Sequence, residues 1–188
     1  REGSTASANS GQQIVLVGQG FNNQTLVSFE AVDESGAVGM LVRSGTAFEN
    51  GTRLRVEVPA LARSGLVRVL GAVGTSRLDV VPTIRSVGGE IAAGEMIVLE
   101  GSGLVNGEVN VQVGGQTVAG PVSVRTVGDF GLDQQIVELT VPVGATGRVV
   151  EVSTSGGRFV YGNGIGLTMT NMGPGDNVGD TISSAFAL

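Results

Sequence analysis

A thirteen-residue block that occurs twice constrains the fold of this chain more than any other feature. GQQIVLVGQGFNN at residues 11–23 aligns without a gap on GEMIVLEGSGLVN at residues 94–106, with seven identical positions. A second pair of blocks, RLRVEVP at 53–59 and IVELTVP at 136–142, keeps the same offset of 83 residues. Because both pairs share one register, we predict that the chain contains two copies of one domain.

The second pair of blocks also predicts which strand faces are buried. Successive side chains of an extended strand point to opposite sides. In both copies the apolar residues alternate with polar or charged ones, apart from Ile136 on the outer face. The apolar face is formed by Leu54, Val56 and Val58 in the first copy and by Val137, Leu139 and Val141 in the second. One buried face per strand indicates antiparallel sheets packed as a sandwich.

Composition supports this fold class. The chain has 32 glycines, only 4% aromatic residues and no tryptophan, which is typical of short strands joined by glycine turns. We therefore predict an all-β protein of two tandem immunoglobulin-like β-sandwich domains with a short C-terminal tail. The predicted boundaries are an N-terminal extension at 1–9, domain 1 at 10–81, domain 2 at 82–170, and a tail or linker at 171–188.

The glycine pair Gly18-x-Gly20 raises the possibility of a phosphate-binding loop. A dinucleotide-binding turn needs a third glycine where Asn23 stands, and it needs a helix where QTLVSFEA predicts a strand. The same arrangement recurs in the second copy, which favours a turn at the end of a strand. The residues that mark the fold in this way are Gly18, Gly20, Phe21, Pro59, Gly101, Gly103, Leu104 and Pro142.

The opening of the second copy resembles a known family. PTIRSVGGEIAAGEMIVLEGSGL at 82–104 is similar to the IPT/TIG family, the immunoglobulin-like fold shared by plexins and transcription factors. The family pattern is a proline, an alternating strand, a glycine-containing spacer and an apolar strand ending in Gly-x-Gly-aromatic. The first copy matches only the later part, because its proline-led strand is missing or degraded, and the second copy has Leu104 at the aromatic position. The resemblance implies a sandwich fold and, with tandem copies, the type found in bacterial extracellular and surface proteins.

Charge and missing residue types exclude several functions. The net charge is −6, with 7 acidic residues against 7 arginines in 1–81 and 10 against 4 in 82–188. This acidic chain lacks the basic surface that binds nucleic acid, and no apolar run is long enough to insert into a membrane. Without histidine or cysteine it has neither a histidine-based catalytic triad nor thiolate metal sites. We predict that it is not an enzyme and has no resident cofactor.

Three groups of residues are candidate sites. Asp176, Asn177 and Asp180 offer the oxygen ligands that calcium takes, although a plain Asp/Asn/Gly turn is the favoured explanation. Phe159 and Tyr161 fall on one strand face and are candidates for ligand or protein contact, with burial at the sandwich edge as the alternative. The third group, Glu30, Asp33 and Glu34, is more typical of a solvated turn than of a carboxylate pair for catalysis or metal binding.

The sequence therefore favours a non-catalytic spacer or assembly module of a bacterial extracellular or cell-surface protein. Its partners would be neighbouring domains of a longer chain. The alternatives are an adhesin or glycan- or protein-binding module that uses its inter-strand loops, and accessory domains of a secreted hydrolase. The apolar end of the tail, TISSAFAL at 181–188, is interpreted as a truncated strand of a following domain or as a segment for self-assembly by strand addition, and the first is favoured.

Overall fold

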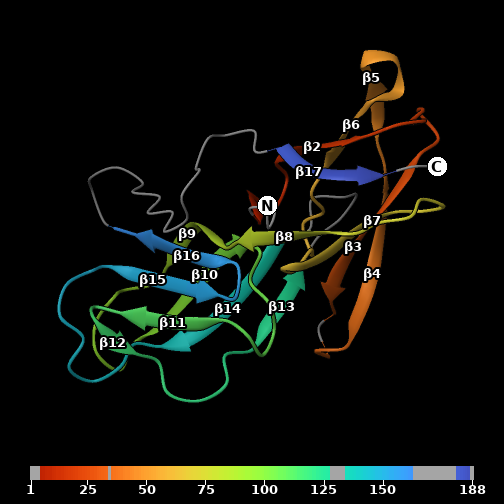
Figure 1. Cartoon of the computed structure of the whole chain (residues 1–188). Coiled ribbons are helices and arrows are strands. Elements are labelled where there is room, and N and C mark those ends of the chain that lie inside the picture. Colours follow the sequence, from red (N-terminus) through yellow and green to blue (C-terminus); the bar gives the residue numbers. More distant parts are fainter. Residues whose placement is uncertain (1–4, 34, 128–133, 163–180, 187–188) are drawn as a thin grey trace.

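The computed structural model describes residues 5–33, 35–127 and 134–162, together with the backbone of 181–186 (Figure 1). Apart from one short 3-10 turn, η1 at Glu49–Gly51, its regular structure is all β. The first part of the chain forms β1 Ala6–Asn9, β2 Gln13–Gly18, β3 Leu26–Val32, β4 Val38–Ser44, β5 Thr46–Phe48, β6 Arg53–Glu57, β7 Gly65–Val69 and β8 Ser76–Val81. The later part forms β9 Thr83–Gly88, β10 Met96–Ser102, β11 Asn110–Val113, β12 Gln116–Thr117, β13 Val124–Val127, β14 Gln134–Thr140, β15 Val150–Thr154, β16 Gly157–Tyr161 and β17 Thr181–Phe186.

These strands build two sandwiches of matching topology. In the second, the sheet β9-β10-β14-β13 faces the sheet β16-β15-β11-β12. In the first, β17-β2-β6-β5 faces β1-β8-β7-β3-β4. From β2 and β10 onward the corresponding strands occupy corresponding places, and the order is that of an immunoglobulin-like sandwich. The predicted fold class is confirmed. Independent folding of each sandwich, with boundaries at 10–81 and 82–170, stays a prediction.

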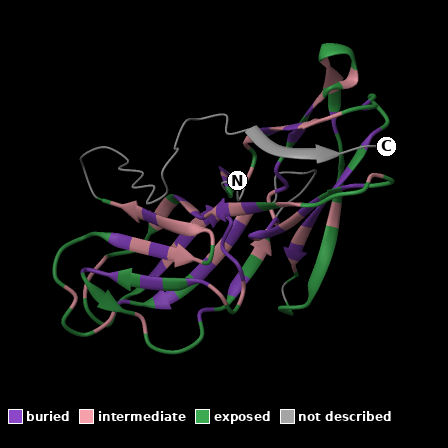
Figure 2. Ribbon diagram, in the orientation of Figure 1, coloured by how far each residue is buried: buried purple, intermediate pink, exposed green. Residues whose placement is uncertain are grey.

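Each sandwich has its own hydrophobic core, and the cores are made by the predicted faces. Leu16 and Leu54 are fully buried in the first cluster, and the equivalent Leu99 and Val137 are fully buried in the second. Figure 2 shows buried residues alternating with intermediate and exposed ones along many of the strands, while the loops are mostly exposed. Burial of a leucine or valine side chain is worth about 1.5–3 kcal/mol, so these faces dominate the stability of each sandwich.

The repeated Gly-x-Gly motif lies at the ends of β2 and β10. Gly20 and Gly103 both have positive φ, 78° and 67°, at the turn that follows β2 and β10. Only glycine adopts this conformation without strain. The turn returns the next residue to the core, where Phe21 is 5% exposed and Leu104 is fully buried. The interpretation of the motif as a fold marker stays a prediction, and these backbone angles and burial agree with a turn that ends a strand.

The two sandwiches differ in the strand beside β2 and β10. In the second, β9 pairs with β10 in antiparallel fashion. In the first, β1 pairs instead with β8, and β17 lies alongside β2 in parallel orientation (Figure 1). The C-terminal segment is therefore paired with this chain's own first sandwich, an arrangement that neither sequence interpretation of the tail named.

Candidate functional site: the junction between the sandwiches

The two sandwiches are joined by a single residue, Pro82, between the end of β8 and the start of β9. Pro82 is buried, and its fixed φ restricts the chain at this point. The Gly103 turn of the second sandwich packs against the connection. A Cβ at Gly103 would lie 3.2 Å from both the Pro82 Cα and the Val81 carbonyl oxygen. The connection is thus held by packing as well as by its length.

The β15–β16 turn of the second sandwich also packs on β8 of the first. A Cβ at Gly156 would overlap the Val80 carbonyl oxygen and the Ser64 Oγ, so this position has room only for glycine. Ser64 Oγ is in turn fixed, because it accepts a 2.9 Å hydrogen bond from the buried Val80 N–H. Because this contact is made by backbone and short side chains, the β15–β16 turn has little freedom to slide along β8.

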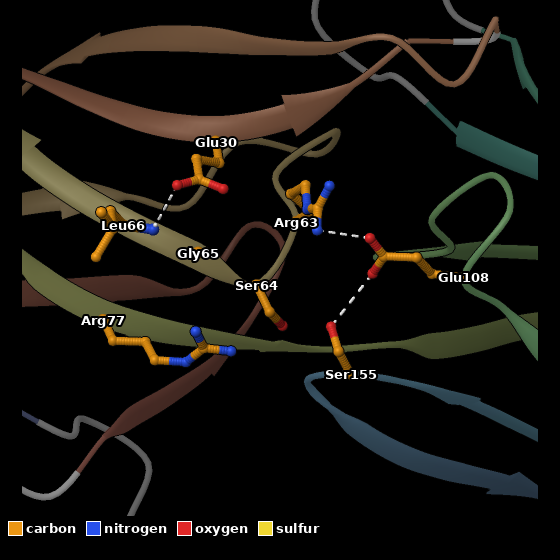
Figure 3. A pocket seen from close by; sticks show the side chains of 8 residues that line it. All are labelled: Glu30, Arg63, Ser64, Gly65, Leu66, Arg77, Glu108 and Ser155. Carbon is orange, nitrogen blue, oxygen red and sulfur yellow. Dashed lines mark hydrogen bonds and ion pairs between the residues drawn. The ribbon is translucent and has the colours of Figure 1, made fainter.

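An ion pair connects the two sandwiches beside this contact (Figure 3). Arg63 Nη2 lies 2.6 Å from Glu108 Oε1, and Ser155 Oγ donates to Glu108 Oε2 at 3.2 Å. The two charged side chains are 23% and 28% exposed, so water screens the pair less than it would at an open surface. Glu108 thereby contacts both a loop of the first sandwich, through Arg63, and the β15–β16 turn of its own sandwich, through Ser155.

The loops that carry this pair are themselves fixed. Arg63 follows a turn in which the Ala62 N–H donates to the Pro59 carbonyl, and its own N–H donates to the Glu30 carbonyl of β3 at 2.9 Å. On the other side, the Glu108 N–H donates to the Val105 carbonyl at 3.0 Å. Pro59, identified from the repeat as a fold marker, thus begins the turn that positions Arg63.

An open cavity of about 400 Å³ lies at the junction. It is lined by Glu30, Arg63, Ser64, Gly65, Leu66, Arg77, Glu108 and Ser155. Small-molecule sites are mostly apolar, whereas most side chains here are polar or charged and several are engaged in hydrogen bonds to the protein itself. Glu30 Oε1, for example, accepts the Leu66 N–H at 3.1 Å. The arrangement is suited to holding two surfaces together.

The two candidate contact residues on β16, Phe159 and Tyr161, differ in burial. Phe159 is only 4% exposed and belongs to the second core, which corrects its assignment as a ligand-contacting ring. It is buried because it lies on the inner face of β16, opposite Val152 in the register. Tyr161 is half-buried and packs against the same core. For Tyr161, a contact with a ligand or protein stays a prediction.

Asp33 lies in the connection between β3 and β4 and is held there by hydrogen bonds to its carboxylate. Asp33 Oδ1 accepts hydrogen bonds from Ser35 Oγ at 2.6 Å and from the N–H groups of Ser35 and Ala37, both at 2.9 Å. The Ser35 hydroxyl and then the Ala37 N–H lower the pKa of Asp33. In the part of the chain that the structure describes, His, Cys, Asp and Glu form no cluster of three or more that could hold a metal ion. The calcium candidates Asp176, Asn177 and Asp180 lie outside the described residues, as does Glu34.

The sequence did not predict the junction residues Arg63, Glu108 and Ser155. Each lies in a loop, where no hydrophobic period indicates a partner. A usable signal was the direct succession of the two predicted copies, at 10–81 and 82–170, because so short a connection brings the ends of both sandwiches into contact.

No family model matches the chain, and no curated protein matches it. Among solved structures, the chain is similar to a marsupial T cell receptor at 13% identity, with a TM-score of 0.27. That match covers 85% of this chain and 61% of the receptor chain. An identity and a TM-score this low support no conclusion about family or function. The fold assignment is based on the strand order. Among the described residues, no helix is long and apolar enough to cross a membrane.

Proposed function

We propose that this chain is a non-catalytic structural module of an extracellular or cell-surface protein, in which two sandwiches act as one stiff spacer. The observation that carries the proposal is the junction. One buried proline joins the sandwiches, Gly156 packs on the β8 backbone, and Arg63 pairs with Glu108 across the interface. Flexible linkers, by contrast, are longer and richer in glycine and serine.

Sequence features support the extracellular setting of the proposal. The resemblance of 82–104 to the IPT/TIG family, the absence of cysteine, the abundance of glycine and the acidic net charge fit tandem repeats in bacterial surface proteins. The positions of the aromatic rings favour a spacer over a glycan-binding module, because Phe159 belongs to the core and Tyr161 packs against it. Sugar-binding platforms need exposed ring faces.

Electron–electron distance measurements between spin labels test the proposal. The chain has no cysteine, so Glu57→Cys and Thr140→Cys place one label on each sandwich at exposed positions that are equivalent in the repeat. A stiff spacer gives one narrow distance distribution. A broad or multimodal distribution would contradict the proposal.

The control is a variant that loosens the junction. Arg63→Ala combined with Ser155→Ala removes the side-chain contacts to Glu108 and leaves both cores intact. This double variant should broaden the distribution without lowering the content of β-structure. An unchanged width would mean that the ion pair does not contribute to the stiffness, and the proline and glycine contacts would then be tested alone.

A further inference from the structure

The outer edge of β2 corresponds to an edge that is filled in the second sandwich. There, β9 covers the outer edge of β10, with Leu99 opposite Val87 and Glu100 opposite Ser86. In the first sandwich the chain before β2 forms β1, which pairs with β8 in the other sheet. The edge of β2 away from β6 is therefore left for a strand from elsewhere in the chain. Unpaired edge N–H and C=O groups favour the addition of such a strand.

The C-terminal segment lies at this edge. Thr181 is opposite Val15 and Ile182 is opposite Leu16; the register then shifts, and Phe186 is opposite Gly18. The segment TISSAF has no charged residue and contains β-branched and aromatic residues, a composition that favours strands. It runs parallel to β2, whereas β9 runs antiparallel to β10; both directions satisfy the backbone groups of an edge.

The repeated glycine provides a second, independent observation. At Gly101 of β10, a Cβ would overlap the Thr83 carbonyl oxygen of β9, at the point where the register of the two strands shifts. Glycine is needed there because a neighbouring backbone passes close by. Gly18 is the equivalent residue of β2 and is opposite Phe186. Since glycine inside a strand costs about 0.5–1 kcal/mol, its presence at this place in β2 is explained by a strand that occupies the edge.

We propose that the outer edge of β2, Gln13–Gly18, is a strand-binding site and that residues 181–186 of the same chain are its ligand. The segment that follows the second sandwich thus completes the first, in the position that the proline-led strand holds in the second. The inference goes beyond a spacer function, because it assigns a peptide-binding edge and its occupant. It also connects the far end of the chain back to its beginning.

Engineered disulfides test this site directly, because the chain has no cysteine of its own. Neighbouring strands lie about 4.8 Å apart, within the Cα separation that a disulfide spans. Val15→Cys with Thr181→Cys should therefore form an intramolecular disulfide in a monomer under mild oxidation. The matched control is Val98→Cys with Thr181→Cys, since Val98 is the equivalent of Val15 in β10, whose outer edge β9 already covers.

The outcomes are distinct. An intramolecular disulfide in the Val15 pair and none in the Val98 pair supports the proposal. Failure of the Val15 pair to cross-link, or equal cross-linking in both pairs, overturns it. A disulfide-linked dimer of the Val15 pair also overturns it, because the ligand would then come from a second copy.

A thermodynamic cycle tests the same site without cysteine. Gly18→Ala should lower the Tm of the full chain by about 2–4 °C, since it adds a methyl group at the residue opposite Phe186 and should disturb the pairing of the two strands. Ile182→Pro removes a backbone N–H from the segment and should weaken its pairing, while Ile182→Val should not. In the Ile182→Pro background, Gly18→Ala should have little further effect. Equal effects of Gly18→Ala in both backgrounds would show that no strand lies on Gly18 and would overturn the proposal.

Discussion

The first and second sandwiches share seven strands in the same order and differ in how the outer edges of β2 and β10 are covered. In the second sandwich the preceding strand, β9, covers β10. In the first, the preceding strand β1 joins the opposite sheet, and β17 lies beside β2. The comparison teaches that the buried faces specify the sandwich, whereas the edge strand is a separate element that more than one segment of the chain can provide.

The two sandwiches also differ in charge, and the junction uses that difference. The first sandwich contributes Arg63 from a region with balanced charge, and the second contributes Glu108 from the acidic region. One carboxylate of the acidic region after residue 81, that of Glu108, is therefore paired with an arginine of the first sandwich at the junction. The following predictions test first what the sandwiches share and then what is specific to one of them.

The largest effect is expected where the sandwiches are equivalent. Leu16→Ala and Leu99→Ala each remove a fully buried side chain at the same repeat position. Each should lower the free energy of unfolding of its sandwich by about 2–5 kcal/mol. Urea unfolding measures the loss, with Val143→Ala, at an 89% exposed residue, as the control. A loss below about 1 kcal/mol at either leucine would contradict equivalent cores.

An effect of intermediate size is expected at the turn between β15 and β16. Gly156→Val places a side chain against the Val80 carbonyl and should destabilise the junction by about 1–3 kcal/mol. Thermal unfolding and the spin-label distance should both change. Gly39→Val is the control, since a Cβ at Gly39 meets nothing within 4 Å. Equal tolerance of both substitutions would show that the turn does not pack on β8.

A smaller effect is expected for the ion pair. A double-mutant cycle of Arg63→Ala and Glu108→Ala should give a coupling energy of about 0.5–1 kcal/mol that decreases as salt is added. The comparison is the pair Arg125–Glu138 within the second sandwich, whose side chains are 59% and 56% exposed and whose coupling should be near zero. If the two cycles gave the same value, the junction pair would be an ordinary surface contact.

The smallest effect is expected at Asp33 in the β3–β4 turn, whose counterpart between β11 and β12 is Gly114-Gly115 and has no carboxylate. Its pKa is lower in the folded protein, so the ionised carboxylate stabilises the turn at neutral pH, and that contribution is lost as the pH falls through the folded pKa. Asp33→Asn should remove this acid dependence. Carboxyl NMR titration checks the direction; a pKa at or above the usual aspartate range would contradict the turn geometry.

The sequence predicted the shared part of the two sandwiches well, for a physical reason. Alternation in strands such as 53–59 and 136–142 depends on a period of two residues and on burial, both of which are local properties. Leu54, Val56 and Val58 are buried as that alternation requires. The Gly20 and Gly103 turns were predictable because their conformation demands a particular residue type.

The contacts that set the junction and the edge were not predictable in the same way. Arg63 and Glu108 meet only because Pro82 and two loops bring them together, and no local pattern encodes that distance. Two features of the sequence indicated the pairing of β17 with β2 indirectly: the first copy lacks the proline-led strand, and the chain has an apolar tail. Those two observations concern opposite ends of the chain, and only the three-dimensional structure connects them.

The central claim is that the two sandwiches form one stiff unit. Residual dipolar couplings of backbone N–H groups, measured separately for residues 6–81 and 83–161, test it most directly. A stiff unit predicts the same alignment tensor, in magnitude and orientation, for both sets. Tensors of different magnitude would show that the sandwiches reorient independently and would contradict the account.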